Sequence, residues 1–253
     1  MTTAVVRLAQ DVVRVEAADR VAIVTLNRPE ARNALSPALV EALWQAMVGL
    51  GERDDIGAVV LTGAHPAFCS GADLKVLREA TGRAWLRRLV DERRGLLLPD
   101  IGLPVVAAVN GPAVTGGLEL ALQCDFIVAS DRARFAETHA RIGIMSAGSI
   151  ASLLPEAIGI RRARQLSFTG EFIDSRTALA WGLVNDVVPH DSLVPRAVDI
   201  AAQMALNDRK AVAFMRTTYQ LTTHDTDVKR RDLEVGRFAE WLRSSEVPSV
   251  HGR

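Results

Sequence analysis

The sequence is poor in cysteine. Only Cys69 and Cys124 occur among its 253 residues. They form neither a Cys-x-x-Cys pair nor a spacing typical of a metal-binding framework. Such sparse cysteines fit free, buried thiols in a reducing compartment. We therefore expect a cytoplasmic protein without a metal site.

The chain also lacks an excess of charge of either sign. Its 30 Lys and Arg residues balance 30 Asp and Glu residues. Binding of nucleic acid or of a lipid surface usually relies on clustered positive charge, and no long basic run is present. The charge balance therefore favours a small-molecule partner and argues against nucleic acid.

Long hydrophobic runs are missing from the first twenty residues, where Arg7, Asp11, Arg14 and Glu16 interrupt the apolar stretches. This pattern predicts neither a signal-peptide core nor a membrane span in that region. Internal repeats and low-complexity linkers are absent as well. The length fits one α/β domain, or one domain with an appendage.

Short apolar runs predict the strands of a sheet. Residues 12–17 and 21–26 are rich in β-branched side chains, and the intervening Ala18, Asp19 and Arg20 predict a hairpin turn. Three further runs, "IGAVVLTG", "LPVVAAVNG" and "DFIVAS", are continuously apolar, as buried strands of a parallel sheet are. Patterns of helical period separate these runs, so we expect an α/β fold.

The first helix is expected directly after the hairpin, because Ser36 is a favourable N-cap and Pro37 stands at the first helical position. From about Ser149 onward the chain becomes mainly helical. Short helices that end at glycine are predicted in residues 149–182, followed by a strand in "LVNDVVP". Amphipathic patterns in the last sixty residues predict helices over 192–206, 209–222 and 228–243.

Two glycine-containing turns follow successive predicted strands. One is "GAHPAFCSGADL" after "AVVLT", and the other is "NGPAVTGGLEL" after "PVVAAV". Each turn leads into a helical pattern, whose first N–H groups lack intrahelical partners and favour negative charge. The N–H groups of Ala72 and Gly116 are therefore candidates for an oxyanion hole. Either turn taken alone is better explained by a tight turn and close helix packing than by a binding site.

Glu119 follows Gly116 by three residues, in the first turn of a predicted helix that otherwise has the composition of a protein core. Two explanations are open at this point. The carboxylate could offset the helix dipole, or it could act as a general acid or base beside developing negative charge.

The segments "AFCSGADL" and "NGPAVTGGLELALQCD", with the leading "VTLNRPEARNALS", resemble the crotonase family, also called the enoyl-CoA hydratase/isomerase superfamily. The likeness extends from about Val12 to Pro189. It implies a crotonase-like spiral of ββα units in residues 1–190, and a helical C-terminal region in residues 191–253 that packs between the subunits of a homotrimer or homohexamer. It also implies an acyl-CoA substrate of fatty-acid metabolism, with coenzyme A as part of the substrate and no separate cofactor.

The resemblance further implies roles for single residues. The N–H groups of Ala72 and Gly116 would bind the thioester oxygen, and Glu119 would be the first catalytic glutamate. The adenine and phosphate end of coenzyme A is expected against two segments, "LNRPEARNAL" and "ADLK". This implicates Arg28, Ala31, Arg32, Asp73, Leu74 and Lys75. For the arginines, ordinary solvated surface charge is an equally good explanation.

The sequence departs from the family pattern at the second catalytic glutamate. Hydratases have "FGxPE" there, whereas this chain has "FAETH", which places His139 at the catalytic position. A histidine could be a core residue or could transfer protons, and its replacement of a catalytic carboxylate favours proton transfer. Glu137 is expected to project differently and to be a poor substitute. The glycine-rich turn that follows is altered to "IMSAGS".

Hydration of an enoyl-CoA is the favoured function, in which Glu119 activates the water that adds at Cβ and His139 protonates Cα. The alternative is another thioester reaction on the same scaffold, such as a thioester or C–C hydrolase with His139 as base. An isomerase is disfavoured because the second glutamate is missing. A non-catalytic acyl-CoA-binding or RNA-binding relative is a third possibility, disfavoured by Glu119 and by the charge balance. Residues 76–100 are expected to form part of the pocket wall.

Overall fold

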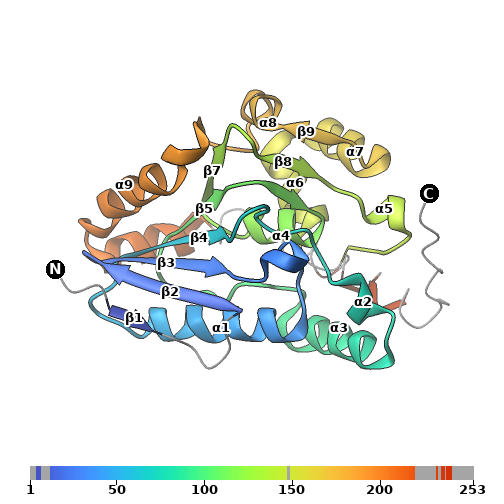
Figure 1. Ribbon diagram of the computed structural model, residues 1–253, viewed down its shortest axis with the longest axis horizontal. Helices are drawn as coiled ribbons and strands as arrows, with labels where there is room; N and C mark the ends of the chain where they lie inside the picture. The colour runs from blue at the N-terminus through green and yellow to red at the C-terminus, as the bar shows by residue number, and fades with distance from the viewer. Residues whose placement is uncertain are drawn as a thin grey trace.

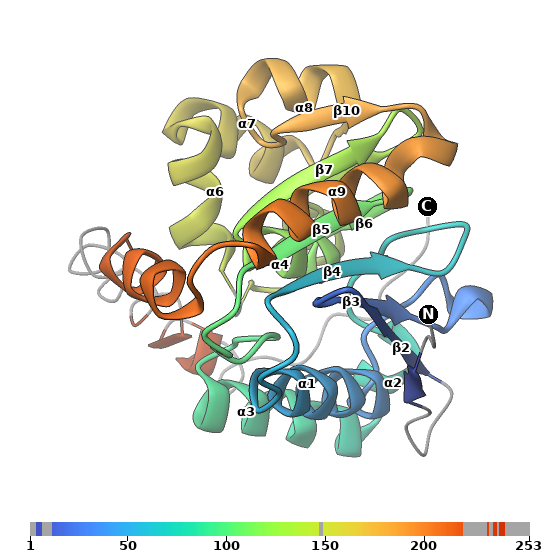
Figure 2. The same ribbon diagram turned by 90° about the vertical axis from the view of Figure 1, so that its left-hand side faces the viewer.

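The computed structural model describes residues 4–6, 12–146, 149–219, 232, 235–236 and 238–240. Its centre is a seven-stranded sheet in the order β1-β2-β3-β4-β5-β7-β10. Helices cover both faces of this sheet (Figures 1 and 2). The strands are β1 (Ala4–Val6), β2 (Val13–Ala18), β3 (Val21–Leu26), β4 (Ala58–Gly63), β5 (Val105–Val109), β7 (Phe126–Ser130) and β10 (Asp186–Val188).

The predicted hairpin is confirmed. Strands β2 and β3 pair antiparallel, and Ala18 lies opposite Val21. The two residues between them, Asp19 and Arg20, both have positive φ, at 49° and 68°. A two-residue turn of this kind suits the right-handed twist of paired strands. The remaining pairs from β3 to β10 are parallel, as the continuous apolar runs predicted.

Burial on both faces explains why the central strands are continuously apolar. In β4, Val59 and Leu61 belong to the larger hydrophobic cluster, while Ala58 and Val60 face the smaller cluster on the opposite side. The larger cluster is shared with α1 (Pro37–Gly51) and α4 (Gly116–Leu122). The smaller one is completed by α9 (Leu193–Ala205), which crosses the sheet in Figure 2.

Helix α1 begins where the sequence predicted. The Ser36 hydroxyl accepts a hydrogen bond from the Leu39 N–H at 3.2 Å, and Pro37 is the first helical residue. Two further helices, α2 (Leu74–Leu77) and α3 (Ala80–Arg93), follow β4. They come from the region that was expected to line the pocket.

A second, three-stranded sheet was not predicted. It is formed by β6 (Pro112–Val114), β8 (Arg134–Ala136) and β9 (Phe172–Asp174), in the order β6-β8-β9. Each strand has three residues, too few to show an alternating pattern. Strand β6 lies inside the second glycine turn, so that turn does not pass directly from strand to helix. The three helices α6 (Ile150–Ile158), α7 (Ile160–Thr169) and α8 (Ser175–Trp181) follow as predicted.

The boundary expected at residues 190 and 191 stays a prediction. Helix α9 lies C-terminal to this boundary and packs directly on β3, β4, β5 and β7. The helix predicted over 209–222 is observed from residue 209 to residue 219, the last one described in that stretch. Most of 228–243 lies outside the described residues. Among the described residues, no helix is both long and apolar enough to span a membrane, and no cluster of potential metal ligands is present.

Candidate active site

The candidate site lies at the N-terminus of α4, where the two glycine turns meet. A parallel bridge joins Leu35 to Ala72: the Leu35 N–H donates to Gly71 O at 2.8 Å, and the Asp73 N–H donates to Leu35 O at 3.0 Å. In such a bridge the N–H of the middle residue points away from its partner strand. The Ala72 N–H therefore points away from Leu35.

Gly116 is the neighbour on that side. A Cβ placed on Gly116 would lie 3.7 Å from the Ala72 nitrogen. In the part of the chain that the structure describes, neither the Ala72 N–H nor the Gly116 N–H donates a hydrogen bond to another protein group. The two N–H groups predicted as a donor pair are thus brought together.

Glycine is required for this close approach of the two turns. A Cβ on Gly71 would lie 2.0 Å from Thr115 Oγ1, and Gly71 has a φ of +88°. A Cβ on Gly117 would lie 2.1 Å from the Cys69 carbonyl oxygen. Thr115 itself has a positive φ of 48°, and its N–H donates to Ala136 O at 2.9 Å. This bond ties the start of α4 to the end of β8.

The Glu119 carboxylate is buried beside these groups, with only 6% of the residue exposed. It lies in the first turn of α4, as predicted. Its Oε1 accepts a hydrogen bond from the Ser146 hydroxyl at 2.8 Å and one from the Ser149 N–H at 3.3 Å. Both donors come from the altered "IMSAGS" segment, and the sequence analysis did not anticipate this contact.

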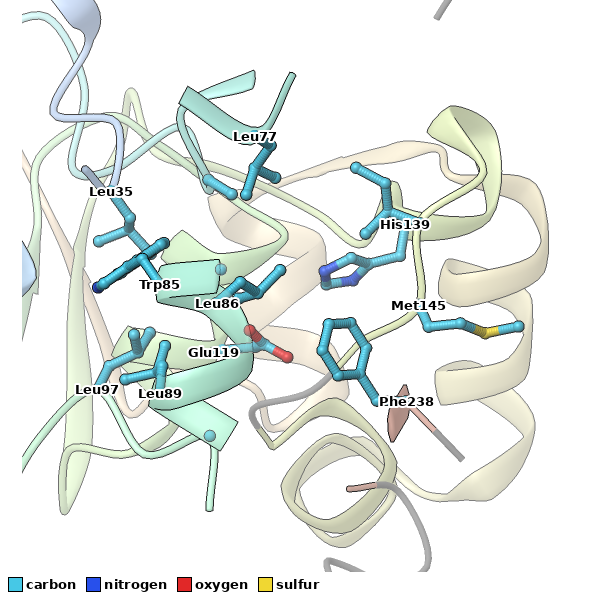
Figure 3. Close-up of a pocket in the computed structure, with 14 residues that line it drawn as sticks. Leu35, Leu77, Trp85, Leu86, Leu89, Leu97, Glu119, His139, Met145 and Phe238 are labelled. Carbon is cyan, nitrogen blue, oxygen red and sulfur yellow. The ribbon is translucent and has the colours of Figure 1, made fainter. Parts of the chain in front are cut away.

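His139 approaches from the opposite side, at the start of α5 (His139–Ile142). In Figure 3 its ring and the Glu119 carboxylate project into the same pocket. The His139 Nδ1 contacts Glu137 Oε1, and the His139 backbone N–H donates to the same oxygen at 3.2 Å. Glu137 is 2% exposed and does not line the pocket. It therefore supports His139, a partnership that the sequence analysis missed.

Ala72 and Gly116, which carry the two N–H groups, line an inner pocket of about 60 Å³. Figure 3 shows this pocket with Glu119 and His139. Residues 76–100 supply much of its wall, as expected. Its charged or titratable lining groups are Glu119 and His139, and the remaining side chains are apolar. The apolar side chains labelled in Figure 3 are Leu35, Leu77, Trp85, Leu86, Leu89, Leu97, Met145 and Phe238.

A larger outer groove of about 640 Å³ adjoins the inner pocket. Ala72, His139 and Ile144 line both spaces, so Ala72 lies at their junction, whereas Gly116 lines the inner pocket. All six residues predicted for coenzyme A binding line the outer groove. They are Arg28, Ala31, Arg32, Asp73, Leu74 and Lys75.

Arg28 has a structural role in this groove. Its Nη2 forms a salt bridge with Asp73 Oδ2 at 3.1 Å, and its Nη1 donates to Ala34 O at 2.7 Å. Asp73 also caps α2 by accepting from the Lys75 N–H at 3.2 Å. Arg32 and Lys75 are exposed. A phosphate contact for Arg28 stays a prediction, and the exposed pair are the better candidates on geometry.

Neither cysteine is suited to act as a nucleophile. Cys69 is fully buried under α4, and burial raises the pKa of its thiol to about 12. Burial also raises the pKa of the Cys124 thiol. Because the thiolate is the reactive form, both side chains are inert near neutral pH.

The chain is similar to known proteins over most of its length. The family model described as "Enoyl-CoA hydratase/isomerase" matches residues 16–251. A putative enoyl-CoA hydratase of Thermus thermophilus is 39% identical over 208 residues, which are 79% of each chain. The mitochondrial enoyl-CoA hydratase of Pongo abelii is 34% identical over 86% of this chain and 75% of its own length.

Solved structures show the same likeness. An enoyl-CoA hydratase from Mycobacterium smegmatis superposes with a TM-score of 0.83 at 38% identity, over 93% of this chain and all of the other. A monofunctional enoyl-CoA isomerase from the same genus and species superposes with a TM-score of 0.70 at 30% identity, over 88% of this chain and 98% of the other.

Proposed function

Because the chain belongs to the enoyl-CoA hydratase/isomerase family, we propose that its site adds water to the double bond of an enoyl-CoA. Its relatives make it an enoyl-CoA hydratase-like enzyme, which is a hydro-lyase. One observation carries the proposal. Two N–H groups and a buried carboxylate converge where an apolar pocket meets a groove with exposed cationic side chains.

The Ala72 and Gly116 N–H groups would donate to the thioester oxygen and form an oxyanion hole. Within the described residues, they donate no hydrogen bond that a substrate would have to displace. The negative charge on this oxygen grows as the enolate forms, so the donors bind the transition state more strongly than the ground state. A single donor of this kind contributes about 2.7–4 kcal/mol in well-studied enzymes.

Glu119 would be the base of the reaction. Its carboxylate takes a proton from water, the water oxygen bonds to Cβ, and the π electrons of the Cα–Cβ bond move toward the carbonyl to give the enolate. His139 then donates a proton to Cα, and the enolate collapses to the saturated thioester. Ser146 and the Ser149 N–H hold one oxygen of Glu119, which orients the carboxylate.

Coenzyme A would lie in the outer groove, with the acyl chain entering the inner pocket past Ala72 and His139. The exposed Arg32 and Lys75 are placed to attract its phosphates. Among the described residues that line the inner pocket, Glu119 and His139 are the charged or titratable ones, and this apolar lining favours an apolar acyl group.

The experiment that tests this function is a panel of enoyl-CoA thioesters with detection of every product by mass. We expect 3-hydroxyacyl-CoA as the main product. Release of free coenzyme A would favour a hydrolase, and a shifted double bond would favour an isomerase. Binding without turnover of any member would favour a non-catalytic relative.

A thioester hydrolase is the second candidate, because a histidine oriented by a carboxylate is also suited to activate water. The pH dependence separates the two roles. If His139 donates a proton, activity declines as rising pH deprotonates the ring. If neutral His139 is the base, activity increases over the same range.

We also propose that the protein assembles as a homotrimer or homohexamer. Large apolar side chains are exposed in the C-terminal region at Leu206, Phe214, Met215 and Tyr219. Exposed apolar side chains that form a contiguous patch commonly mark a contact surface. Sedimentation should show a trimer or hexamer, and a stable monomer at micromolar concentration would contradict this. Localisation in the cytoplasm and independence of a metal or added cofactor are further parts of the proposal, the latter tested by activity in the presence of a chelator.

A further inference from the structure

His139 lies where a hydratase of this family carries its second carboxyl group, and Glu137 is in direct contact with it. A histidine alone would change the charge of the site, since a protonated imidazole is positive whereas a carboxylic acid is neutral. The buried Glu137 carboxylate is placed to balance the positive charge of a protonated His139 ring, which removes this difference in charge.

Backbone hydrogen bonds hold the chain directly before Glu137 in place. Glu137 directly follows β8, whose last residue Ala136 pairs with β6 and β9 and accepts the Thr115 N–H at 2.9 Å. Thr115 immediately precedes Gly116. The backbone next to Glu137 therefore has a defined position relative to the turn that holds the Gly116 N–H.

One carboxylate oxygen of Glu137 receives both contacts from His139. The backbone N–H donates to Oε1 at 3.2 Å, and the ring Nδ1 contacts the same atom. An ionised carboxylate only accepts hydrogen bonds, so this contact with an ionised Glu137 requires the ring proton on Nδ1. Nε2 is then the ring atom that changes protonation during the reaction, and orienting the ring is a common task of a carboxylate next to a histidine.

We infer that Glu137 is a positioning residue that makes the Glu137–His139 pair the equivalent of one carboxylic acid. When both ring nitrogens carry protons, the pair is neutral, as a carboxylic acid is. When Nε2 has lost its proton, the pair carries one negative charge, as a carboxylate does. The pair thus retains the charge pattern of a two-glutamate site although the sequence has changed.

This inference rests on the proposed hydration and adds one detail to its proton balance. The Nε2–H bond breaks and its electron pair stays on Nε2, while the enolate supplies the electron pair of the new Cα–H bond. At that point Glu119 holds the proton taken from water, and the pair is negative. Transfer of this proton from Glu119 to Nε2 through solvent restores the starting state.

The direct test is the tautomer of His139, measured by NMR on protein with nitrogen-15-labelled histidine. The chain has 5 histidines, so the His139 signals are assigned as those missing from His139→Gln. We expect protonated Nδ1 in the parent at every pH at which the protein is folded. A neutral ring with its proton on Nε2 in the parent would overturn the inference, and this outcome does not depend on turnover.

The kinetic test is Glu137→Gln, with hydration of crotonyl-CoA as the readout. We expect kcat to fall by at least about tenfold, because a general acid contributes about 10²–10⁴-fold and depends on its orientation. KM should stay within about threefold, because Glu137 lines neither pocket. The matched control is Glu16→Gln, which removes an exposed carboxylate on β2 and should leave both constants unchanged.

A double variant separates this role from a purely structural one. His139→Glu alone places two carboxyl groups side by side, and their repulsion disfavours two negative charges. Adding Glu137→Gln removes the second charge and leaves a single carboxylic acid. We therefore expect Glu137→Gln with His139→Glu to hydrate crotonyl-CoA at least about tenfold faster than His139→Glu alone.

The outcomes distinguish the inference from the proposed function. If the parent hydrates crotonyl-CoA but Glu137→Gln retains its kcat, or if the double variant is no faster than His139→Glu, the inference is wrong and hydration stands. If the parent hydrates no enoyl-CoA, the proposed function fails, and the tautomer measurement still decides whether the pair exists. Circular dichroism checks folding, and if Glu137→Gln does not fold, the double variant and the tautomer decide.

Discussion

The two walls of the inner pocket supply chemistry in different ways. On the glycine wall, formed by residues 71–72 and 116–117, the candidate groups are backbone N–H donors. A Cβ added at any of its three glycines would lie 2.0–2.9 Å from a neighbouring atom. On the side-chain wall, formed by residues 137–146 and 149, the groups are the side chains of Glu137, His139 and Ser146. The chemistry of the glycine wall depends on the absence of side chains at its glycines. The chemistry of the side-chain wall depends on which side chains are present.

This difference explains where the chain keeps its family pattern and where it departs from it. Stabilising an enolate oxygen requires two donors at a fixed separation, and a backbone held by interlocking turns provides that with little freedom. Proton transfer requires a group of suitable acidity, and several side chains or pairs can provide it. The glycine wall therefore suits many thioester reactions, whereas the side-chain wall determines which one occurs.

Glu119 links the two walls, so its substitution should have the largest effect. It is part of α4, yet its carboxylate accepts hydrogen bonds from Ser146 and Ser149 on the side-chain wall. Glu119→Gln retains the shape but removes the base, and turnover should fall by about two to four powers of ten while acyl-CoA binding persists. Steady-state kinetics and a binding titration measure both. Turnover within a few-fold of the parent would show that the assigned base is wrong.

Gly116→Ala tests the glycine wall itself. The added methyl group would lie 3.7 Å from the Ala72 nitrogen and 2.9 Å from Leu35 Cδ1. The end of the leucine side chain can move, so the fold should survive, but the methyl group occupies space beside both donors. We expect turnover to fall by about 10²–10³-fold, similar to the loss of one oxyanion donor. Normal kinetics in a folded Gly116→Ala protein would contradict an oxyanion hole at this position.

Gly117→Ala separates packing from catalysis on the same wall. Its added methyl group would lie 2.1 Å from the Cys69 carbonyl oxygen, which is backbone and cannot rotate away. The free energy of unfolding should fall by about 1–3 kcal/mol or more, as measured by urea denaturation.

The matched control for this substitution is Gly49→Ala, because Gly49 also lies in a helix, α1. No heavy atom lies within 4 Å of the added methyl group at Gly49. This change should raise the free energy of unfolding by about 0.4–1 kcal/mol. Equal effects of the two substitutions would show that the turns are not interlocked as described.

The smallest expected effect concerns the thiol beneath the glycine wall. Burial raises the pKa of Cys69 from 9.0 to about 12. Native protein at pH 8 should therefore resist iodoacetamide at this residue, while unfolded protein should react. Because the folded thiol loses its proton at higher pH than the unfolded one, its contribution to stability is fully present below pH 9 and is lost as pH rises toward 12. Rapid alkylation of Cys69 in the native protein would contradict its burial.

Much of the fold could be predicted from the sequence because local signals were strong. The β2–β3 turn, the Ser36 cap and the continuous apolar strands each rest on a few neighbouring residues. Strands β6, β8 and β9 could not be predicted, because three residues show no period and their pairing depends on segments far apart in the chain.

The features of the site also divide into those that the sequence predicted and those that it did not. Ala72, Gly116 and Glu119 were identified by motifs, and the structure brings them together. The contacts of Glu137 with His139 and of Ser146 with Glu119 were missed, because they depend on how the chain turns after β8. The i and i+2 spacing of Glu137 and His139, at the passage from a strand into a helix, was the one local signal available.

Hydration of an enoyl-CoA requires groups on both walls of the pocket. Turnover in oxygen-18-labelled water distinguishes hydration from hydrolysis of the thioester. Crotonyl-CoA is incubated with the enzyme, and every product is identified by mass. We expect 3-hydroxybutyryl-CoA with one oxygen-18 atom at Cβ and an intact thioester, and we expect its formation to be strongly reduced in Glu119→Gln. Labelled oxygen in a free carboxylic acid, together with released coenzyme A, would contradict hydration and identify a thioester hydrolase.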